Sequence, residues 1–242
     1  MKVLFVGDGR TDIGAAVQNP AERLAGGPIP ILTRKIIHAI DRDSPAISWQ
    51  DVPRFNPNRQ KAGYEHQVTA AIVVSARSFD CQATVCVADQ DGDHSRIEAM
   101  NRGRDRGVLL SRGAHQCVCG VAVRSIEAWS LGVPDAIAVV LKRDEKQVRD
   151  LYPHHRVEEL YELSGKEEHR PKSLLRKLAQ LQDRKADVAF REEIAENTDI
   201  AKLEQACQLG FKPFAEALRI AFPPDVPPHG GDSAKPDAGT ES

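Results

Sequence analysis

The first half of the chain alternates short apolar runs with segments of helical spacing. Apolar runs of strand length predict four β-strands, at Val3–Val6, Ala46–Val52, Ala83–Ala88 and Cys117–Val123. Segments with helical spacing lie between them, at Ile31–Ile40, Arg59–Arg77 and Ser95–Arg106. This order is typical of an α/β protein whose mostly parallel four-stranded sheet is flanked by helices. The third run is uniformly apolar, which predicts a central strand.

The second half of the chain is predicted to be helical. After Trp129, helical segments are expected at Pro134–Lys142, Glu145–Leu151, Arg156–Leu163, Pro171–Gln182, Ala186–Cys207 and Lys212–Phe222. From Pro223 onward, Pro, Gly, Ser and Asp dominate, so this segment cannot bury enough apolar surface to fold. We therefore expect an α/β domain over 1–133, a helical C-terminal region over 134–222 packed on it, and a disordered tail over 223–242. The stretch before Ile31, interrupted by Pro28 and Pro30, predicts a loop that could contain one short helix.

Composition limits the partners and the compartment. With 41% apolar residues among 242, the chain can bury a core, and its formal charge of -2 requires any nucleic acid to bind at a local basic patch. The five cysteines are odd in number and stand in apolar runs, which suits buried free thiols in a reducing compartment. Neither a signal-peptide core nor the ~20 apolar residues of a membrane span is visible. We expect a cytoplasmic protein without membrane contact.

Acidic residues follow three of the four predicted strands. They are Asp8 and Asp12 after the first strand, Asp89, Asp91 and Asp93 after the third, and Glu127 after the fourth. The carboxyl ends of parallel strands meet at one edge of the sheet, where ligands bind in such folds. Carboxylates gathered there repel one another unless a cation lies among them. Because Mg²⁺ prefers carboxylate and water oxygens, the pattern predicts a magnesium site that could also take Mn²⁺.

The segment Asp89-Gln-Asp-Gly-Asp93 has two other interpretations. Its last residues could form a polar turn in which Asp93 or Ser95 caps the next helix. It also resembles the DxDGT motif of haloacid dehalogenase phosphatases, in which the first aspartate is the nucleophile. An EF-hand loop is excluded, because Gly92 comes too early and Met100 stands where the twelfth-position glutamate is required.

Three motifs together resemble the Toprim family, the catalytic domain of type IA and type II topoisomerases, bacterial primases and OLD-type nucleases. They are VGDGRTD around Asp8, VADQDGD around Asp89 and VRSIEAW around Glu127. The greatest likeness is to a bacterial Toprim-like branch, related to OLD-type nucleases, that carries EGxTE, DxDG and IEAW motifs before a helical region. The resemblance covers roughly residues 1–222. It implies a Rossmann-like Toprim fold and a magnesium-dependent nuclease acting on DNA or RNA.

The resemblance also implies roles for single residues. Asp8 and Asp12 fall on the glutamates of EGxTE, which suggests catalytic roles for both and a metal contact for Asp8. Asp89 and Asp91 fall on the metal-binding acids of DxD, with Asp93 as an outer helper, and Glu127 falls on the acid of IEAW. Two metals about 4 Å apart would stabilise the attacking and leaving oxygens. Since aspartate is shorter than glutamate, the changes at Asp8 and Asp12 leave open a binding or regulatory subunit with altered catalysis. A phosphatase is the third possibility.

Basic residues near these motifs are candidate phosphate or nucleic-acid contacts, namely Arg10, His94, Arg96 and Arg124. Arg124 could equally be the ion partner of Glu127, three residues later. Lys172 is expected to be solvated on its helix, although it could contribute to a nucleic-acid groove, and Trp129 is expected to pack in the core. Through the resemblance to OLD-type nucleases, we further expect an ATPase partner in a bacterial defence system.

Overall fold

The computed structural model describes residues 1–13, 26–52, 63–111, 115–152 and 156–223. Its centre is a parallel sheet with strand order β2-β1-β3-β4. The strands are β1 (Val3–Gly7), β2 (Ala46–Ser48), β3 (Ala83–Asp89) and β4 (Gln116–Ala122). Helices cover both faces, so the predicted α/β class with a parallel four-stranded sheet is confirmed and the fold is Rossmann-like. The predicted tail from residue 224 and the predicted helix start at 59–62 lie outside the described residues.

Alternate residues of each strand face opposite helical layers. Val3 and Phe5 of β1 belong to one apolar cluster, whereas Leu4 and Val6 belong to another. The second cluster includes α4 (Tyr64–Ser78) and α5 (Arg96–Leu110), which cover one face of the sheet. β3 lies between β1 and β4 and is buried along its whole length, so the predicted central strand is confirmed.

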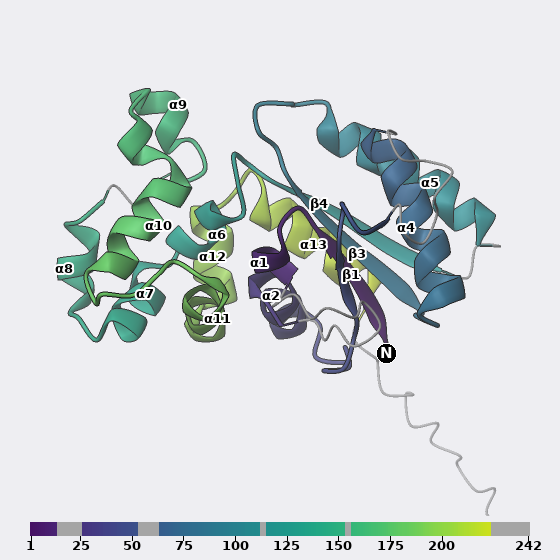
Figure 1. The fold of residues 1–242 in the computed structure, drawn as a ribbon, viewed down its shortest axis with the longest axis horizontal. Helices are drawn as coiled ribbons and strands as arrows, with labels where there is room; N and C mark the ends of the chain where they lie inside the picture. Colours follow the sequence, from purple (N-terminus) through teal and green to yellow (C-terminus); the bar gives the residue numbers. More distant parts are fainter. Residues whose placement is uncertain (14–25, 53–62, 112–114, 153–155, 224–242) are drawn as a thin grey trace, which may run out of the picture.

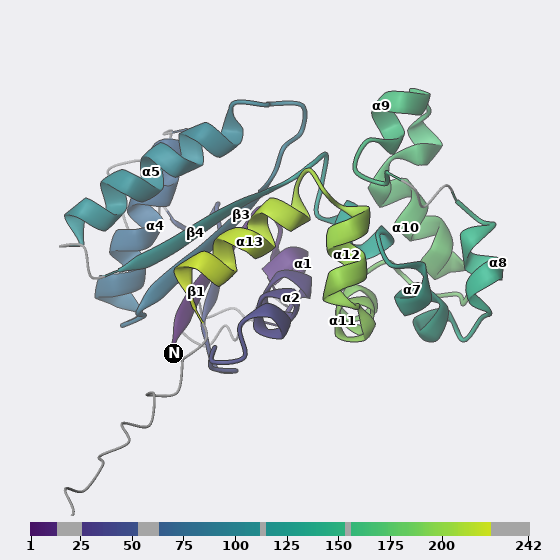
Figure 2. The ribbon, with the colours of Figure 1, turned by 180° about the vertical axis from the view of Figure 1, so that it is seen from behind.

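The opposite face is covered by helices from both ends of the chain. They are α1 (Arg10–Ile13), α2 (Pro28–Ile36) and α13 (Phe211–Ala221), and Figure 2 shows α13 lying along the sheet. The contact between α13 and β4 is close, because a Cβ built on Gly120 would stand 2.5 Å from Cδ2 of Phe214. The last helix is therefore part of the sheet's covering layer.

The remaining helices form a group beside the carboxyl edge of the sheet (Figure 1). They are α6 (Glu127–Leu131), α7 (Pro134–Leu141), α8 (Glu145–Arg149), α9 (Leu160–Ser164), α10 (Pro171–Gln180), α11 (Val188–Asn197) and α12 (Ile200–Ala206). Three of them begin at aspartates that cap the helix. Asp144 accepts a hydrogen bond from the Lys146 amide, Asp187 accepts one from the Phe190 amide, and Asp199 accepts one from the Lys202 amide.

Several predicted boundaries were wrong. The segment Ala186–Cys207 is two helices rather than one, because Thr198 is extended and Asp199 caps a new helix. The segment Arg156–Leu163 is helical only from Leu160 to Ser164. The second strand ends at Ser48 instead of Val52, since its only strand partner, β1, ends at Gly7, opposite Ser48.

The helix predicted over Ile31–Ile40 is present, but its bounds were wrong, because it takes in the end of the stretch that was predicted to be mainly loop. The helix begins at Pro28 and ends at Ile36. Proline is tolerated in the first helical turn, where its missing N–H has no partner to lose. Pro28 and Pro30 both lie in that turn, so they begin the helix instead of breaking it.

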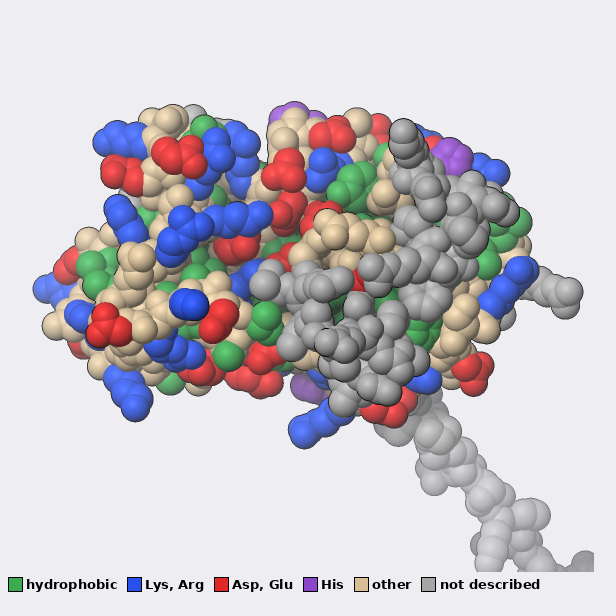
Figure 3. All heavy atoms as spheres, viewed as in Figure 1, with side chains coloured by type: hydrophobic (Ala, Val, Ile, Leu, Met, Phe, Trp, Pro, Cys, Tyr) green, Lys and Arg blue, Asp and Glu red, His purple; other side chains and the backbone are tan. Residues whose placement is uncertain are grey.

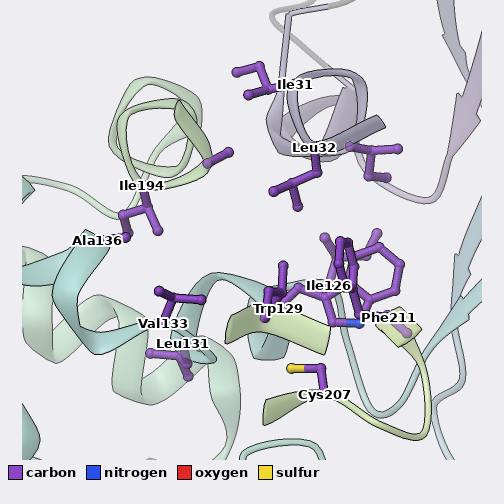
Figure 4. Packing of buried hydrophobic residues seen from close by; sticks show 14 of the residues in the cluster. Ile31, Leu32, Ile126, Trp129, Leu131, Val133, Ala136, Ile194, Cys207 and Phe211 are labelled. Atoms are coloured by element: carbon purple, nitrogen blue, oxygen red, sulfur yellow. The ribbon is translucent and has the colours of Figure 1, made fainter. Parts of the chain in front are cut away.

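The apolar core continues from the sheet into the group of helices. Figure 4 shows Leu32 of α2 pointing toward Trp129, and Ile194 of α11 lying beside Ala136 of α7. Trp129 is fully buried and its ring stacks on Phe214, with centroids 5.6 Å apart, which confirms its predicted core position. All five cysteines are buried free thiols, as expected. Within the described part of the chain, no helix is both long and apolar enough to span a membrane.

Candidate functional site

Three of the predicted acids meet at the carboxyl edge of the sheet. Asp8 follows β1, Asp89 is the last residue of β3, and Glu127 begins α6 shortly after β4. Because all these strands are parallel, their last residues lie at the same edge, and Asp89 is in register with Ala122 of β4. The sequence-based expectation that the strands deliver acids to one place is met by these three residues.

Asp89 occupies the middle of this edge. It is only 5% exposed, its Oδ1 accepts a hydrogen bond of 2.9 Å from the Ile126 amide, and its Oδ2 lies 3.6 Å from Nζ of Lys172. Burial, together with the negative charges of Glu127 and Asp12, raises the pKa of Asp89 to about 7, against the opposing effect of Lys172. The carboxyl group therefore lies among like charges and can exchange a proton near neutral pH.

Asp8 is held by two donors. The Asp89 amide donates to its Oδ2, and the Tyr64 hydroxyl donates to its Oδ1 at 2.9 Å. Burial raises the pKa of Asp8, although both hydrogen bonds favour the charged form. Tyr64 is fixed in turn, because its ring meets the ring of Trp49 edge-on and lies under the Arg96 guanidinium. The orientation of Asp8 thus depends on both α4 and β3.

Asp12 and Glu127 share a buried arginine. Nη2 of Arg191, on α11, lies 2.6 Å from Oδ1 of Asp12, and its Nη1 lies 3.4 Å from Oε1 of Glu127. Oδ2 of Asp12 accepts a hydrogen bond from the Gly9 amide at 2.9 Å. Arg191 is 2% exposed, so its charge is neutralised by these acids and not by water. Asp12 is thereby directed toward Arg191.

The helix that carries Arg191 is fixed by further polar contacts. Nζ of Lys35, on α2, donates to the carbonyl oxygens of Glu196 and Thr198 at 2.6 Å each, at the end of α11. The Gly27 amide, just before α2, donates a hydrogen bond to the side chain of Glu192 on α11. These bonds hold α11 against α2 and place the guanidinium at the acids.

The second and third aspartates of the DQDGD segment lie in an exposed turn. Asp91 has φ of 49° and a 66% exposed side chain, and Gly92 has φ of 81°. Asp93 accepts hydrogen bonds from the Ser95 amide and hydroxyl, which lower the pKa of its carboxyl, and Ser95 begins α5. The turn interpretation therefore describes Asp91 and Asp93 well, whereas Asp89 alone of the three is buried at the edge.

Arg96 links this turn to the site. Its Nη1 donates to the Asp89 carbonyl, and the guanidinium lies 3.7 Å from Asp91 and 3.9 Å from Asp93. His94 contacts the Gln90 side chain at 3.2 Å. Arg10 begins α1, but its side chain lies outside the described residues. Of the predicted phosphate contacts on this side, Arg96 is the one that touches the buried aspartate.

Positive side chains lie on the other side of Asp89. The Lys172 side chain is 60% exposed, as expected for a solvated residue, and its Nζ also lies close to the Asp89 carboxylate. Arg124, with φ of 63°, lies over the ring of Tyr161 at 4.5 Å from its centroid. Figure 3 shows Lys and Arg side chains over α9 and α10 facing Asp and Glu side chains near the middle of the view.

The donor set suits a hard cation held by few ligands. Among the residues that the structure describes, no three His, Cys, Asp or Glu side chains are arranged as a ready metal cage. Magnesium commonly binds through one or two carboxylates and completes its shell with water or phosphate. Asp89 and Glu127, whose charges repel and which Arg191 and Lys172 only partly offset, are the residues that would hold it.

Arg191 and Tyr64 were not recognised as site residues in the sequence. For Arg191 a signal exists, because Phe190, Ile194 and Ala195 form the buried stripe of α11 and the arginine lies on it. A charged residue on an apolar stripe needs a buried partner. Nothing in the local sequence of Tyr64 indicates its contact with Asp8.

Comparison with known proteins adds no relative. No family profile matches the chain, and neither a curated protein nor a solved structure matches it.

Proposed function

We propose that this protein is a Toprim-type nuclease that hydrolyses phosphodiester bonds of DNA or RNA with Mg²⁺ or Mn²⁺. The observation that carries the proposal is the convergence of Asp8, Asp89 and Glu127 at one sheet edge, where repulsion and burial bring the pKa of Asp89 to about 7. Strongly perturbed carboxyl groups gathered at a ligand-binding edge are typical of functional sites.

The residues divide into three roles under this proposal. Asp89 and Glu127 would hold the metal, which would neutralise charge on the transferring phosphate. Asp8, oriented by Tyr64 and the Asp89 amide, accepts a proton from the attacking water. Arg191 positions Asp12 and Glu127, and the exposed Asp91 and Asp93 stay outside the inner metal shell.

Cleavage assays test this assignment. Plasmid, single-stranded DNA and RNA are incubated with Mg²⁺, Mn²⁺ or EDTA and with the wild type, Asp89→Asn or Asp93→Asn. We expect metal-dependent cleavage that Asp89→Asn abolishes and Asp93→Asn largely retains. Equal activity of wild type and Asp89→Asn would contradict the proposal. Hydrolysis of a phosphomonoester without cleavage of nucleic acid would favour the phosphatase alternative instead.

The ion pairs of Arg191 favour one second candidate. Because an arginine already neutralises Asp12 and Glu127, the protein could bind nucleic acid as a catalytically altered subunit, for example beside an ATPase. This candidate predicts nucleic-acid binding without cleavage in every metal arm of the assay.

A further inference from the structure

Two arginines from different elements lie over one tyrosine ring next to the site. The Cζ atom of Arg124, in the turn after β4, is 4.5 Å from the ring centroid of Tyr161, and that of Arg170, which precedes α10, is 4.7 Å away. Arg170 also donates to the Tyr161 hydroxyl at 3.2 Å. A guanidinium packed on a ring has lost part of its freedom, so binding a phosphate costs it less entropy.

The backbone of Arg124 supports a functional reason for this arrangement. Its φ of 63° lies in the left-handed region, which disfavours a side chain with a Cβ. Residues held in this conformation cluster at ligand-binding positions. Here the strained residue stands directly after β4, at the edge that carries Asp89.

Lys172 connects the two arginines to the acidic residues. It lies two residues after Arg170 in the first turn of α10, and its Nζ is 3.6 Å from Oδ2 of Asp89. Positive groups therefore continue from the Tyr161 ring to the buried carboxylate. Figure 3 shows that Lys and Arg side chains over α9 and α10 lie next to Asp and Glu side chains on this face of the molecule.

We propose that Arg124, Arg170 and Lys172 form a phosphate track that binds a nucleic-acid backbone and leads one phosphodiester to Asp89. The track deepens the proposed nuclease function and rests on it for the fate of the bound phosphodiester. It also supplies the local basic patch that a chain of net charge -2 needs. Contacts of this kind fix the position of the backbone and read no sequence.

Binding without metal tests the phosphate track separately from catalysis. The affinity of the full-length protein for labelled single-stranded DNA, RNA and duplex DNA is measured by fluorescence anisotropy in EDTA at several salt concentrations. The test variant is Arg124→Gln/Arg170→Gln. The matched control, Arg149→Gln/Arg219→Gln, removes the same charge from α8 and α13, where Arg149 is ion-paired with Glu145 as Arg170 is with Glu167.

We expect the test variant to bind on the order of tenfold more weakly and its logarithmic salt slope to fall by about 1.5, as for two lost phosphate contacts. The control should bind like the wild type, and the strand form bound most tightly identifies the natural occupant. Equal weakening by both variants would show a net-charge effect only and overturn the phosphate track. So would wild-type binding to polyglutamate as tight as to oligonucleotides, which would indicate an acidic protein partner.

A separate hydrolysis assay tests the proposed nuclease function. Hydrolysis of bis(p-nitrophenyl) phosphate by the wild type with Mn²⁺ needs no long backbone. If the protein binds oligonucleotides specifically but does not hydrolyse this ester, the phosphate track is supported and the nuclease function is contradicted. If it hydrolyses the ester but does not bind oligonucleotides specifically, only the phosphate track is contradicted.

Discussion

A guanidinium nitrogen of Arg191 lies 2.6 Å from a carboxylate oxygen of Asp12, although 179 residues separate the two in the chain. The same guanidinium reaches Glu127, so one buried side chain on helix α11 joins helix α1 and helix α6. The acidic edge of the sheet is therefore completed by the C-terminal helices.

Removing Arg191 is expected to destabilise the protein strongly. In Arg191→Met, Asp12 and Glu127 lose their buried counter-charge, at a cost of about 3–5 kcal/mol in the free energy of unfolding. Arg184→Met, which breaks a more exposed ion pair with Glu193, should cost under about 1 kcal/mol. Urea unfolding measures both. Adding Asp12→Asn and Glu127→Gln to Arg191→Met should recover part of the loss, and no recovery would contradict the electrostatic cause.

Replacing Asp89 is expected to stabilise the metal-free protein at high pH. The folded-state pKa of about 7 lies above the ordinary value near 4, so the folded protein holds this proton more tightly and loses stability as pH rises through that window. Asp89→Asn removes this loss, and the Oδ1 of the asparagine can still accept the hydrogen bond from the Ile126 amide. The gain should be at most about 4 kcal/mol at pH 8 and about 2 kcal/mol at pH 5.

Asp93→Asn is the matched comparison for this pH dependence. The Asp93 pKa is lowered by its bonds to Ser95, so its ionised form contributes stability above the ordinary pKa that is lost on acidification. Its substitution should therefore reduce stability at pH 8, with a sign opposite to that of Asp89→Asn. Thermal unfolding in EDTA at several pH values measures the stability of both variants. A change in stability of the same sign in both would show that burial does not govern the pKa of Asp89.

Lys172 is expected to set the pH at which the proposed site binds metal. Its positive charge lowers the pKa of Asp89, so Lys172→Gln should raise that pKa further and shift Mn²⁺ binding to higher pH. Lys177→Gln, on an exposed position of the same helix, should cause no shift. Titration of Mn²⁺ binding by electron paramagnetic resonance at several pH values makes the comparison. If the pH dependence of Mn²⁺ binding is unchanged in Lys172→Gln, the charge of Lys172 does not act on the proposed site.

The contact between α13 and the sheet offers a packing test. In Gly120→Ala the new Cβ would meet the Phe214 ring, so we expect a loss of about 1–3 kcal/mol in the free energy of unfolding. Phe214→Leu removes ring atoms from the same place. If the two side chains compete for one space, the double variant will lose less than the sum of the single losses. Additive losses would mean that the two positions do not touch.

The periodic parts of the fold could be predicted from the sequence. Uniformly apolar runs such as Ala83–Ala88 predicted the central strand, and strand-terminal acids predicted that Asp8, Asp89 and Glu127 would meet. Local patterns of this kind contain the information because strand ends in a parallel sheet share one edge. Boundaries were less predictable, as Pro28 and Thr198 show, since proline and cap residues act differently inside and at the start of a helix.

The positive half of the site could not be predicted in the same way. Lys172 and Arg191 come from helices far along the chain, and their approach to Asp89 and Asp12 depends on how α10 and α11 pack against the sheet edge. Tertiary packing decides such contacts, and neither spacing nor charge pattern encodes it locally. The separation of buried Asp89 from exposed Asp91 likewise follows from the turn geometry at Gly92.

Locating a bound metal by crystallography tests directly whether Asp89 and Glu127 form a metal site. Crystals of the wild type and of Asp89→Asn are soaked in Mn²⁺ at concentrations that support cleavage, and anomalous difference maps are calculated. We expect a peak within coordination distance of the Asp89 and Glu127 carboxylates in the wild type and its loss in Asp89→Asn. A wild-type map without a peak at these two residues would contradict the proposed metal site.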